Sequence, residues 1–267
     1  MAGWPGTHAT AASQQLKPLP SLSPNASPHV RLLLICIALS VVGLQPALTQ
    51  AAPTLKPYSA RYNVKYRGLS GGDIEFKLER DGNNRYVFSS HLLPNFLGSL
   101  FASDQAEDRS VLSYDGQTLK PLQFSSEDGT QKTSKDIRYE FDWSRHQVNG
   151  HYKDKDFTLT IADGVQDRMT IQLAASLALQ AGQEPGQLIM LERKELQRHR
   201  IQQVGTEHIK TRAGEYDTVL LSSERDASER STRYWYAPAL NYIPVRAERS
   251  TKGKVDIVME LEAYQAL

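Results

Sequence analysis

A serine flanked by glycines is the pattern in this chain that most resembles a catalytic motif. Residues 68–72, GLSGG, match the G-x-S-x-G pattern of serine hydrolases. In those enzymes the serine occupies a strained turn between a strand and a helix, beside the donors that stabilise an oxyanion. Here the residues that follow alternate as a strand, which is typical of a glycine-rich hairpin turn. We therefore predict that Ser70 is not a nucleophile.

The histidines and acidic residues lack the spacings that hold metal ions. None of the histidines belongs to an H-E-x-x-H motif or to a close ligand cluster. Asp154 and Asp156 resemble the first ligands of a calcium loop, but the glycine and the distal glutamate of that loop are missing. We expect no metal, no cofactor and no catalytic residue. The histidines beyond residue 51 are His91, His146, His151, His199 and His208.

A group of charged residues near the C-terminal end allows two interpretations. One is a solvated sheet face whose cross-strand ion pairs are each worth less than about 1 kcal/mol. The other is an arginine-lined groove for anionic head groups, because guanidinium groups bind carboxylate and phosphate through paired hydrogen bonds. The residues concerned are Glu224, Arg225, Asp226, Glu229, Arg230 and Arg233.

Apolar and aromatic residues supply the other candidate site. Residues 92–102, LLPNFLGSLFA, carry no charge and predict a short apolar helix over about 93–101, after Pro94. Such a helix is either buried in the core or contacts a membrane or an apolar ligand. Aromatic rows likewise line both cores and cavities. The candidate ligand-binding residues are Tyr62, Tyr66, Leu93, Phe96, Leu97, Leu100, Phe101, Trp235 and Tyr242.

Alternation of apolar and polar residues is the strongest structural signal and must position these side chains. Tyr58, Ala60, Tyr62, Val64 and Tyr66 share one face of a strand whose other face is polar. The same period of two recurs in later segments, which predicts an antiparallel meander with one face toward water. These segments cover about 73–79, 86–90, 136–143, 157–161 and 255–262.

One segment has the period of a helix. Apolar residues between Asp167 and Ala181 fall on a single helical stripe. Asp167 suits the N-cap, Gly182 suits the C-terminal end, and Pro185 prevents the helix from resuming. We predict a helix over 167–181, packed against the concave face of the sheet.

The N-terminal residues have the composition of an export signal. Residues 30–51 contain Arg31, an apolar stretch and a small-residue cleavage site at Ala51, which predicts a secretory signal peptide. Residues 1–29 show no periodicity and are interpreted as a disordered or untranslated extension, with Val30 as the alternative start. We expect the rest of the chain in the periplasm, or anchored to the membrane if the signal is not cleaved.

The composition of residues 52–267 excludes several classes of protein. This part is long enough for one β-rich domain and contains no cysteine, because Cys36 lies in the signal. Without Lys17 and Arg31, 29 of the 31 basic residues remain against 30 acidic ones. Such a balance does not favour a nucleic-acid partner. Charges of both signs on the strand faces also exclude an integral outer-membrane barrel, so we expect no integral membrane protein after signal cleavage.

Three short runs resemble a known family. GEYDTV at 214–219, RYWYAP at 233–238 and YIPVR at 242–246 resemble the closing half of a bacterial family labelled domain of unknown function 3108. GVQDRM at 164–169 is also similar, although Thr170 stands where a serine is expected. The resemblance covers most of the chain beyond residue 51. It implies an exported, β-rich protein and assigns no catalytic residue.

Together these features predict a mostly β, antiparallel fold: a strongly curved sheet or half-open barrel with one packed helix. The mouth of such a sheet is where apolar ligands bind in several barrel folds. We expect a non-enzymatic envelope protein that binds or carries an apolar or lipid-like ligand. An envelope interaction module with a filled barrel is the alternative, and a hydrolase of envelope polymers has the least support.

Overall fold

The fold is described from a computed structural model, over residues 52–96, 98–100, 103–130, 136–226 and 228–267. The predicted signal peptide and the extension before it, residues 1–51, lie outside this part. Within the part described, α2 has 11 residues, and no helix is long and apolar enough to cross a bilayer.

Period two in the sequence produces fourteen strands among the described residues. The first eight are β1 (Tyr58–Tyr66), β2 (Leu69–Arg80), β3 (Arg85–Pro94), β4 (Glu107–Tyr114), β5 (Leu119–Glu127), β6 (Ile137–Asp142), β7 (Gln147–Tyr152) and β8 (Lys155–Thr160). The last six are β9 (Gly186–Glu192), β10 (Glu195–Thr211), β11 (Gly214–Arg225), β12 (Arg230–Ala237), β13 (Ile243–Thr251) and β14 (Lys254–Ala266). The helical elements are α2 (Thr170–Gln180), η1 (Gly98–Leu100) and η3 (Pro238–Leu240).

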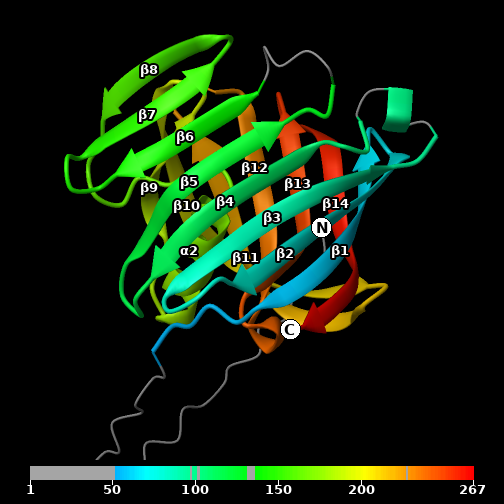
Figure 1. The fold of residues 1–267 in the computed structure, drawn as a ribbon. Helices are drawn as coiled ribbons and strands as arrows, with labels where there is room; N and C mark the ends of the chain where they lie inside the picture. Colours follow the sequence, from blue (N-terminus) through cyan, green and yellow to red (C-terminus); the bar gives the residue numbers. More distant parts are fainter. Residues whose placement is uncertain (1–51, 97, 101–102, 131–135, 227) are drawn as a thin grey trace, which may run out of the picture. The chain divides into compact units, whose positions relative to one another are not determined.

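All fourteen strands belong to one antiparallel sheet with the order β8 to β1, then β14 to β9. Each half is therefore a meander of consecutive hairpins, and the pairing of β1 with β14 joins the two halves. The sheet curls strongly but does not close, because β8 and β9 are its two edges (Figure 1). The predicted mostly β fold, a strongly curved antiparallel sheet with a packed helix, is confirmed.

Two contacts bridge the halves near the open edges. Gln166 makes a parallel bridge to Met190 of β9, with backbone hydrogen bonds of 2.8 Å on either side of it. The hydroxyl of Tyr139 on β6 donates to the backbone carbonyl of Arg193, in the β9–β10 turn, at 2.8 Å. The chain that leaves β8 thus covers part of the unpaired edge of β9, which limits the exposed backbone there.

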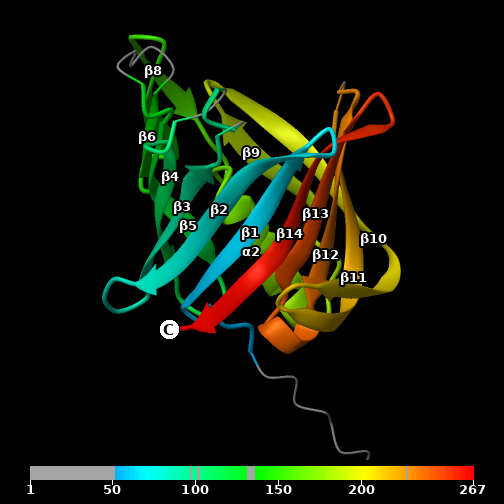
Figure 2. The same cartoon turned by 90° about the vertical axis from the view of Figure 1, so that its right-hand side faces the viewer.

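The predicted helix forms as α2, which begins at Thr170, three residues after the capping residue Asp167. The Oδ1 atom of Asp167 accepts hydrogen bonds from the backbone N–H groups of Met169 and Thr170, both at 2.8 Å. Such a cap satisfies donors that the first helical turn leaves free. Gly182 follows the helix with a positive φ of 65°, as its role at the C-terminal end predicts. Figures 1 and 2 show α2 inside the curve of the sheet.

The second predicted helix, over about 93–101, is wrong for its first four residues. Leu93 and Pro94 extend strand β3 in register with β2, and the turn that follows is only the 3₁₀ segment Gly98–Leu100. Strand pairing replaces the predicted helix at these two residues. Pro94 is tolerated because it pairs with Gly72 at the end of the β2–β3 ladder, where a missing N–H costs little. Residues 97, 101 and 102 lie outside the described part.

The glycine-rich run at 68–72 is a hairpin turn, as predicted. Arg67 and Gly68 both have positive φ, 49° and 84°, which is the backbone of a two-residue I′ turn. Ser70 already belongs to strand β2 and pairs with Lys65. A nucleophile elbow needs a helix after the serine, and a strand follows here.

Candidate functional site

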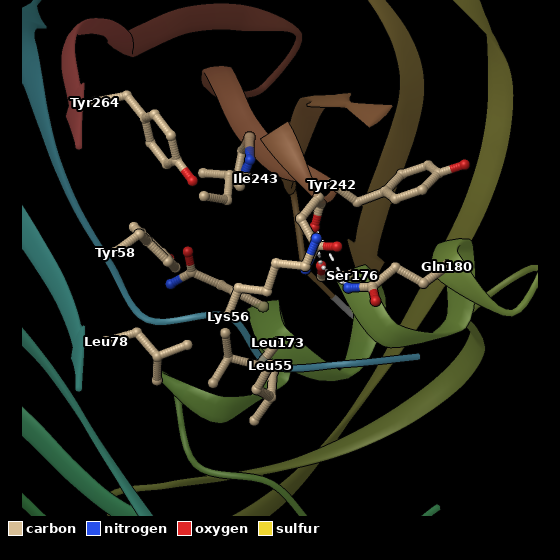
Figure 3. Close-up of a pocket in the computed structure, with 13 residues that line it drawn as sticks. Leu55, Lys56, Tyr58, Leu78, Leu173, Ser176, Gln180, Tyr242, Ile243 and Tyr264 are labelled. Carbon is tan, nitrogen blue, oxygen red and sulfur yellow. Dashed lines mark hydrogen bonds between the residues drawn. The ribbon is translucent and has the colours of Figure 1, made fainter. Parts of the chain in front are cut away.

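The interior of the curled sheet is closed at one end. There α2 meets the loop after η3 and the chain segment that enters β1 (Figure 3). Gln180 Nε2 donates to the Asn241 carbonyl at 3.3 Å, and Asn241 Nδ2 donates to the Thr54 carbonyl at 3.0 Å. The space left among these side chains is about 20 Å³, enough for about one water molecule. We call this end the base.

The opposite end is open and holds the turns β9–β10, β11–β12 and β13–β14 (Figure 2). We call this end the mouth. Two cavities adjoin between mouth and base on the inner face of the sheet, and their linings share Gln172, Thr232, Tyr234 and Arg249. Both volumes together fall within the roughly 300–1,000 Å³ of small-molecule sites.

One cavity, here the aromatic pocket, is lined mainly by β1, β2, β3, β13 and β14 and has a volume of about 230 Å³. Four of its rings lie in one row: the Tyr62 and Phe76 centroids are 5.6 Å apart, Phe76 and Phe88 5.9 Å, and Phe88 and Tyr58 6.2 Å. Burial raises the pKa of Tyr62 well above its usual value, so the phenol stays uncharged. The other residues that line the pocket are Gln172, Thr232, Tyr234, Pro244, Ala247, Arg249, Ile257 and Met259.

The other cavity, here the arginine cavity, is lined mainly by α2 and strands β9–β12 and has a volume of about 370 Å³. Four arginines but only one carboxylate, that of Glu192, line it. Helix α2 supplies Ile171 and Ala175 to the wall, so the surface is apolar on one side and cationic on the other. The arginines are Arg168, Arg225, Arg230 and Arg249.

Arg249 is held rigidly between the two cavities. Its Nε donates to Asp256 Oδ1 at 2.9 Å and its Nη2 to Asp256 Oδ2 at 3.2 Å, a bidentate pair across the β13–β14 hairpin. Thr251 also donates to this carboxylate, at 2.8 Å. The hydrogen bond from Arg249 is the largest cause of the lowered pKa of Asp256. Within the described residues, Nη1 of Arg249 makes no hydrogen bond.

Arg225 and Arg230 differ in how far their charges are compensated. Arg225 donates to Gln197 Oε1 at 3.0 Å and forms an ion pair with Glu192 at 3.3 Å. The guanidinium of Arg230 makes no hydrogen bond or ion pair in the part of the chain that the structure describes, and its charge acts on Asp256. The cavity wall therefore carries a net positive charge that no neighbouring carboxylate neutralises fully.

His199 and Ser223 are the closest approach to a hydrolytic pair. Ser223 Oγ lies 3.5 Å from His199 Nδ1, at the limit of a hydrogen bond, and Nε2 of the histidine is buried without a partner among the described residues. Burial, and then the charge of Arg225, lowers the pKa of His199. A catalytic pair needs a third group to orient the imidazole. Among the described residues no such group contacts the imidazole of His199.

The candidate residues on and around β1 divide between the inner face and the surface. Tyr62 lines the aromatic pocket, and its hydroxyl donates to the Pro244 carbonyl at 2.8 Å. Tyr66, at the mouth end of the same strand, is half exposed beneath the guanidinium of Arg67. Tyr242 lines the small space at the base (Figure 3).

The apolar candidates after β2 lie outside the cavities. Leu93 is 40% exposed and Phe96 is 82% exposed, near the exposed Leu69 of the β1–β2 hairpin. Asn95 ties their loop to that hairpin through a 2.9 Å hydrogen bond from Nδ2 to the Ser70 carbonyl. Leu100 belongs to the 3₁₀ turn η1, and Leu97 and Phe101 lie outside the described residues.

Trp235 is buried, but on the opposite face of β12 from Tyr234 and Tyr236. Its indole N–H donates to Glu207 Oε2 at 2.9 Å, and the guanidinium of Arg233 lies 4.9 Å from its ring centroid. The β10–β11 hairpin covers this outer face. Arg233 therefore belongs to a surface ion pair with Glu207 and does not reach the arginine cavity.

Several cavity residues were not singled out from the sequence. Tyr234, Tyr236, Arg249, Arg168 and His199 all line the interior. A signal for part of this set is present: Arg230, Thr232, Tyr234 and Tyr236 follow one another at intervals of two on one strand face. Because Arg233 is three residues from Arg230, it falls on the opposite face of the strand. No local pattern in the sequence indicates that Arg168 or Arg249 lies near Arg230.

No group of three or more histidine, cysteine, aspartate or glutamate side chains that could hold a metal ion occurs among the described residues. Arginine, tyrosine and aliphatic side chains dominate both cavities instead. Guanidinium groups bind anions through hydrogen bonds, and aromatic and aliphatic side chains bind apolar surfaces by contact.

The fold and its cavities define a class: a β-barrel-like protein whose curled, open antiparallel sheet surrounds a helix. The sequence profile of the family described as protein of unknown function (DUF3108) matches residues 61–262, and the chain belongs to this family. The predicted family is thereby confirmed. No curated protein matches this chain.

Three solved structures align with this chain at low sequence identity. A β-barrel-like protein of domain of unknown function DUF1849 from Brucella abortus aligns with a TM-score of 0.58 and 12% identity, over 81% of this chain and 100% of that one. A candidate exported protein of YmcC-like fold from Bacteroides fragilis has a TM-score of 0.39 and 14% identity, covering 80% and 97%. A candidate lipoprotein from Parabacteroides distasonis has 0.37 and 10%, covering 80% and 97%. The first of these supports the fold.

Proposed function

We propose that this protein is a non-enzymatic carrier of an apolar or lipid-like ligand in the periplasm, exported through a cleaved signal peptide. One observation carries the proposal: the interior of the sheet is packed shut at the base but retains two adjoining cavities that lead to the mouth. A purely structural barrel would gain stability by filling this space, because each cavity forfeits packing contacts.

The lining supports an apolar ligand. The aromatic pocket offers four rings in tilted or T-shaped contact with aliphatic residues opposite them, and burial keeps Tyr62 uncharged. Burial of a hydrocarbon chain against such a surface gains about 25 cal/mol per Å² of apolar area. The exposed Leu69, Leu93 and Phe96 provide an apolar lip at the end where a ligand would enter.

The test is extraction of protein purified from its own cells without detergent. Organic extraction followed by mass spectrometry should recover lipid in a fixed ratio to protein, and native mass spectrometry should show the same mass bound. Ala247→Phe, which fills the aromatic pocket, should lower that ratio, whereas Ala263→Phe on the exposed side of β14 should not. Absence of lipid, with no uptake of added lipid, would rule out the carrier.

An envelope interaction module is a second candidate, favoured by the free edge of β8. Within the described residues β8 pairs only with β7, so its outer backbone groups are available to another strand. Cross-linking in cells through a photoreactive residue at Thr158 of β8 should then capture an envelope protein. Recovery of no cross-linked partner would exclude this function.

A further inference from the structure

We propose that the ligand is an anionic amphiphile, whose carboxylate or phosphate head group is bound by Arg230 and Arg249 while its chain lies in the aromatic pocket. The inference rests on the proposed carrier function and adds the chemical class and orientation of the ligand. It starts from the arrangement of the two cavities: they adjoin at Arg249, which lines both, and Arg230 lines only the arginine cavity, on the mouth side of Arg249.

The arginines are preorganised for an anion. Asp256 fixes the plane of the Arg249 guanidinium by two hydrogen bonds, at the point where the arginine and aromatic cavities adjoin. Arg230 comes from the neighbouring strand, two register positions toward the mouth, and pairs with Thr251. Because Asp256 binds Nε and Nη2 of Arg249, the Nη1 group can donate a hydrogen bond to a ligand oxygen.

The charge balance also requires an anion. Of the four arginines of the cavity, Arg168 is paired with Asp108 at 3.4 Å and Arg225 with Glu192 at 3.3 Å. Arg249 and Arg230 share the single carboxylate of Asp256. Arg193 adds a further positive charge at the rim, where Glu229 is already paired with Lys252. A cationic head group would meet unbalanced repulsion here.

The geometry fixes the direction of the chain. Beyond Arg249 the lining changes from charged to aromatic and aliphatic side chains, among them Tyr62, Phe76 and Met259. The packed base prevents the chain from leaving at the far end. An amphiphile can thus satisfy both surfaces only with its head at the mouth.

The experiment is titration calorimetry of the purified protein, delipidated, with amphiphiles of equal chain length below their micellar concentrations. Laurate and dodecyl phosphate supply the two anionic head groups, monolaurin a neutral one and dodecyltrimethylammonium a cationic one. We expect both anions to bind at least about tenfold more tightly than monolaurin, as one charge-assisted hydrogen bond would give. We expect no binding of the cation.

Arg230→Gln and Arg233→Gln form a matched pair of variants. They remove the same charge from the same strand, but Arg233 faces outward beside Glu207. Arg230→Gln should weaken laurate about tenfold and leave monolaurin unchanged, whereas Arg233→Gln should change neither. Since the guanidinium of Arg230 makes no hydrogen bond among the described residues, the variant is expected to fold, and its unfolding midpoint checks this.

The outcomes separate this proposal from the carrier function. If monolaurin binds as tightly as laurate, or if both variants weaken laurate equally, the head-group assignment is wrong and the carrier function stands. If none of the four amphiphiles binds, both are wrong. A preference for dodecyl phosphate over laurate, or the reverse, supports the assignment and identifies the source of the anion.

Discussion

The hydroxyl of Ser110 donates a 2.6 Å hydrogen bond to Oδ2 of Asp167, and neither residue is exposed to solvent. The other oxygen of the same carboxylate caps α2 through Met169 and Thr170. The Asp167 side chain therefore links strand β4 to the start of α2, and so sets where α2 lies inside the sheet. This link is the structural basis of both cavities, whose walls α2 completes.

We predict that Asp167→Ala destabilises the protein by about 1–3 kcal/mol, because the helix loses its cap and the Ser110 hydroxyl loses its acceptor. Urea unfolding, read as the change in midpoint at constant slope, measures the loss. Ser110→Ala is the matched control: it removes the strand contact but keeps the cap, so its cost should be the smaller. An equal or larger cost for Ser110→Ala would contradict the capping role.

The pH dependence of stability should report Asp167 as well. Burial raises the pKa of its carboxyl group and outweighs the hydrogen bonds that lower it. Between the unfolded pKa, about 3.9, and the raised folded pKa, the folded state binds more protons than the unfolded state. The free energy of unfolding therefore falls as pH rises through this window. Relative to Asp167→Asn, the wild type should gain stability as pH drops from 7 toward 4, measured by urea unfolding across that range. A loss of relative stability on acidification would count against this assignment.

Two neighbouring glycines should respond very differently to alanine. Gly72 has φ of 120°, and a Cβ there would collide with the backbone carbonyl of Leu93, whereas a Cβ at Gly71 meets nothing closer than 3.7 Å. Gly72→Ala should cost about 1–3 kcal/mol from strain and overpacking, and Gly71→Ala much less. Thermal unfolding of both variants tests this. Equal melting temperatures would show that the pairing of β2 with β3 is less constrained than the structure indicates.

His208 near the end of the β10–β11 hairpin should titrate above its ordinary pKa. Its hydrogen bonds to the carboxylates, first of Asp217 and then of Glu215, raise its pKa because they favour the protonated imidazole. The stabilisation from this pairing is present below the unfolded pKa and is lost as pH rises through the folded pKa. NMR titration should give a midpoint above about 6.5, and Asp217→Asn should lower it. Asp156→Asn, on the β7–β8 hairpin, should leave it unchanged. A midpoint insensitive to Asp217→Asn would disprove the contact in solution.

Trp235→Phe distinguishes the two faces of β12. We predict a loss of about 1 kcal/mol in unfolding free energy, from the hydrogen bond to Glu207, with the affinity for laurate unchanged. Tyr234→Ala, on the inner face, should weaken laurate instead. Titration calorimetry with laurate on the two variants measures both affinities. Weaker laurate binding in Trp235→Phe would place the ligand outside the barrel.

The sequence by itself determined the local elements. Alternation between Tyr58 and Tyr66, the turn at Gly68, and the stripe and cap at Asp167 all follow from periods and conformational preferences within a few residues. It also predicted Tyr62 as a candidate. It was wrong about the helix over 93–101, because an apolar run without charge suits a strand end as well as a helix.

Only the tertiary structure decided which faces point inward and which distant residues meet. Both Trp235 and Tyr234 are apolar enough to be buried, and the fold alone places one beneath the β10–β11 hairpin and the other in the cavity. Arg168 and Arg249 converge because β1 pairs with β14 and because α2 is fixed inside the curve. Such pairings depend on long-range packing and register, which no local pattern encodes.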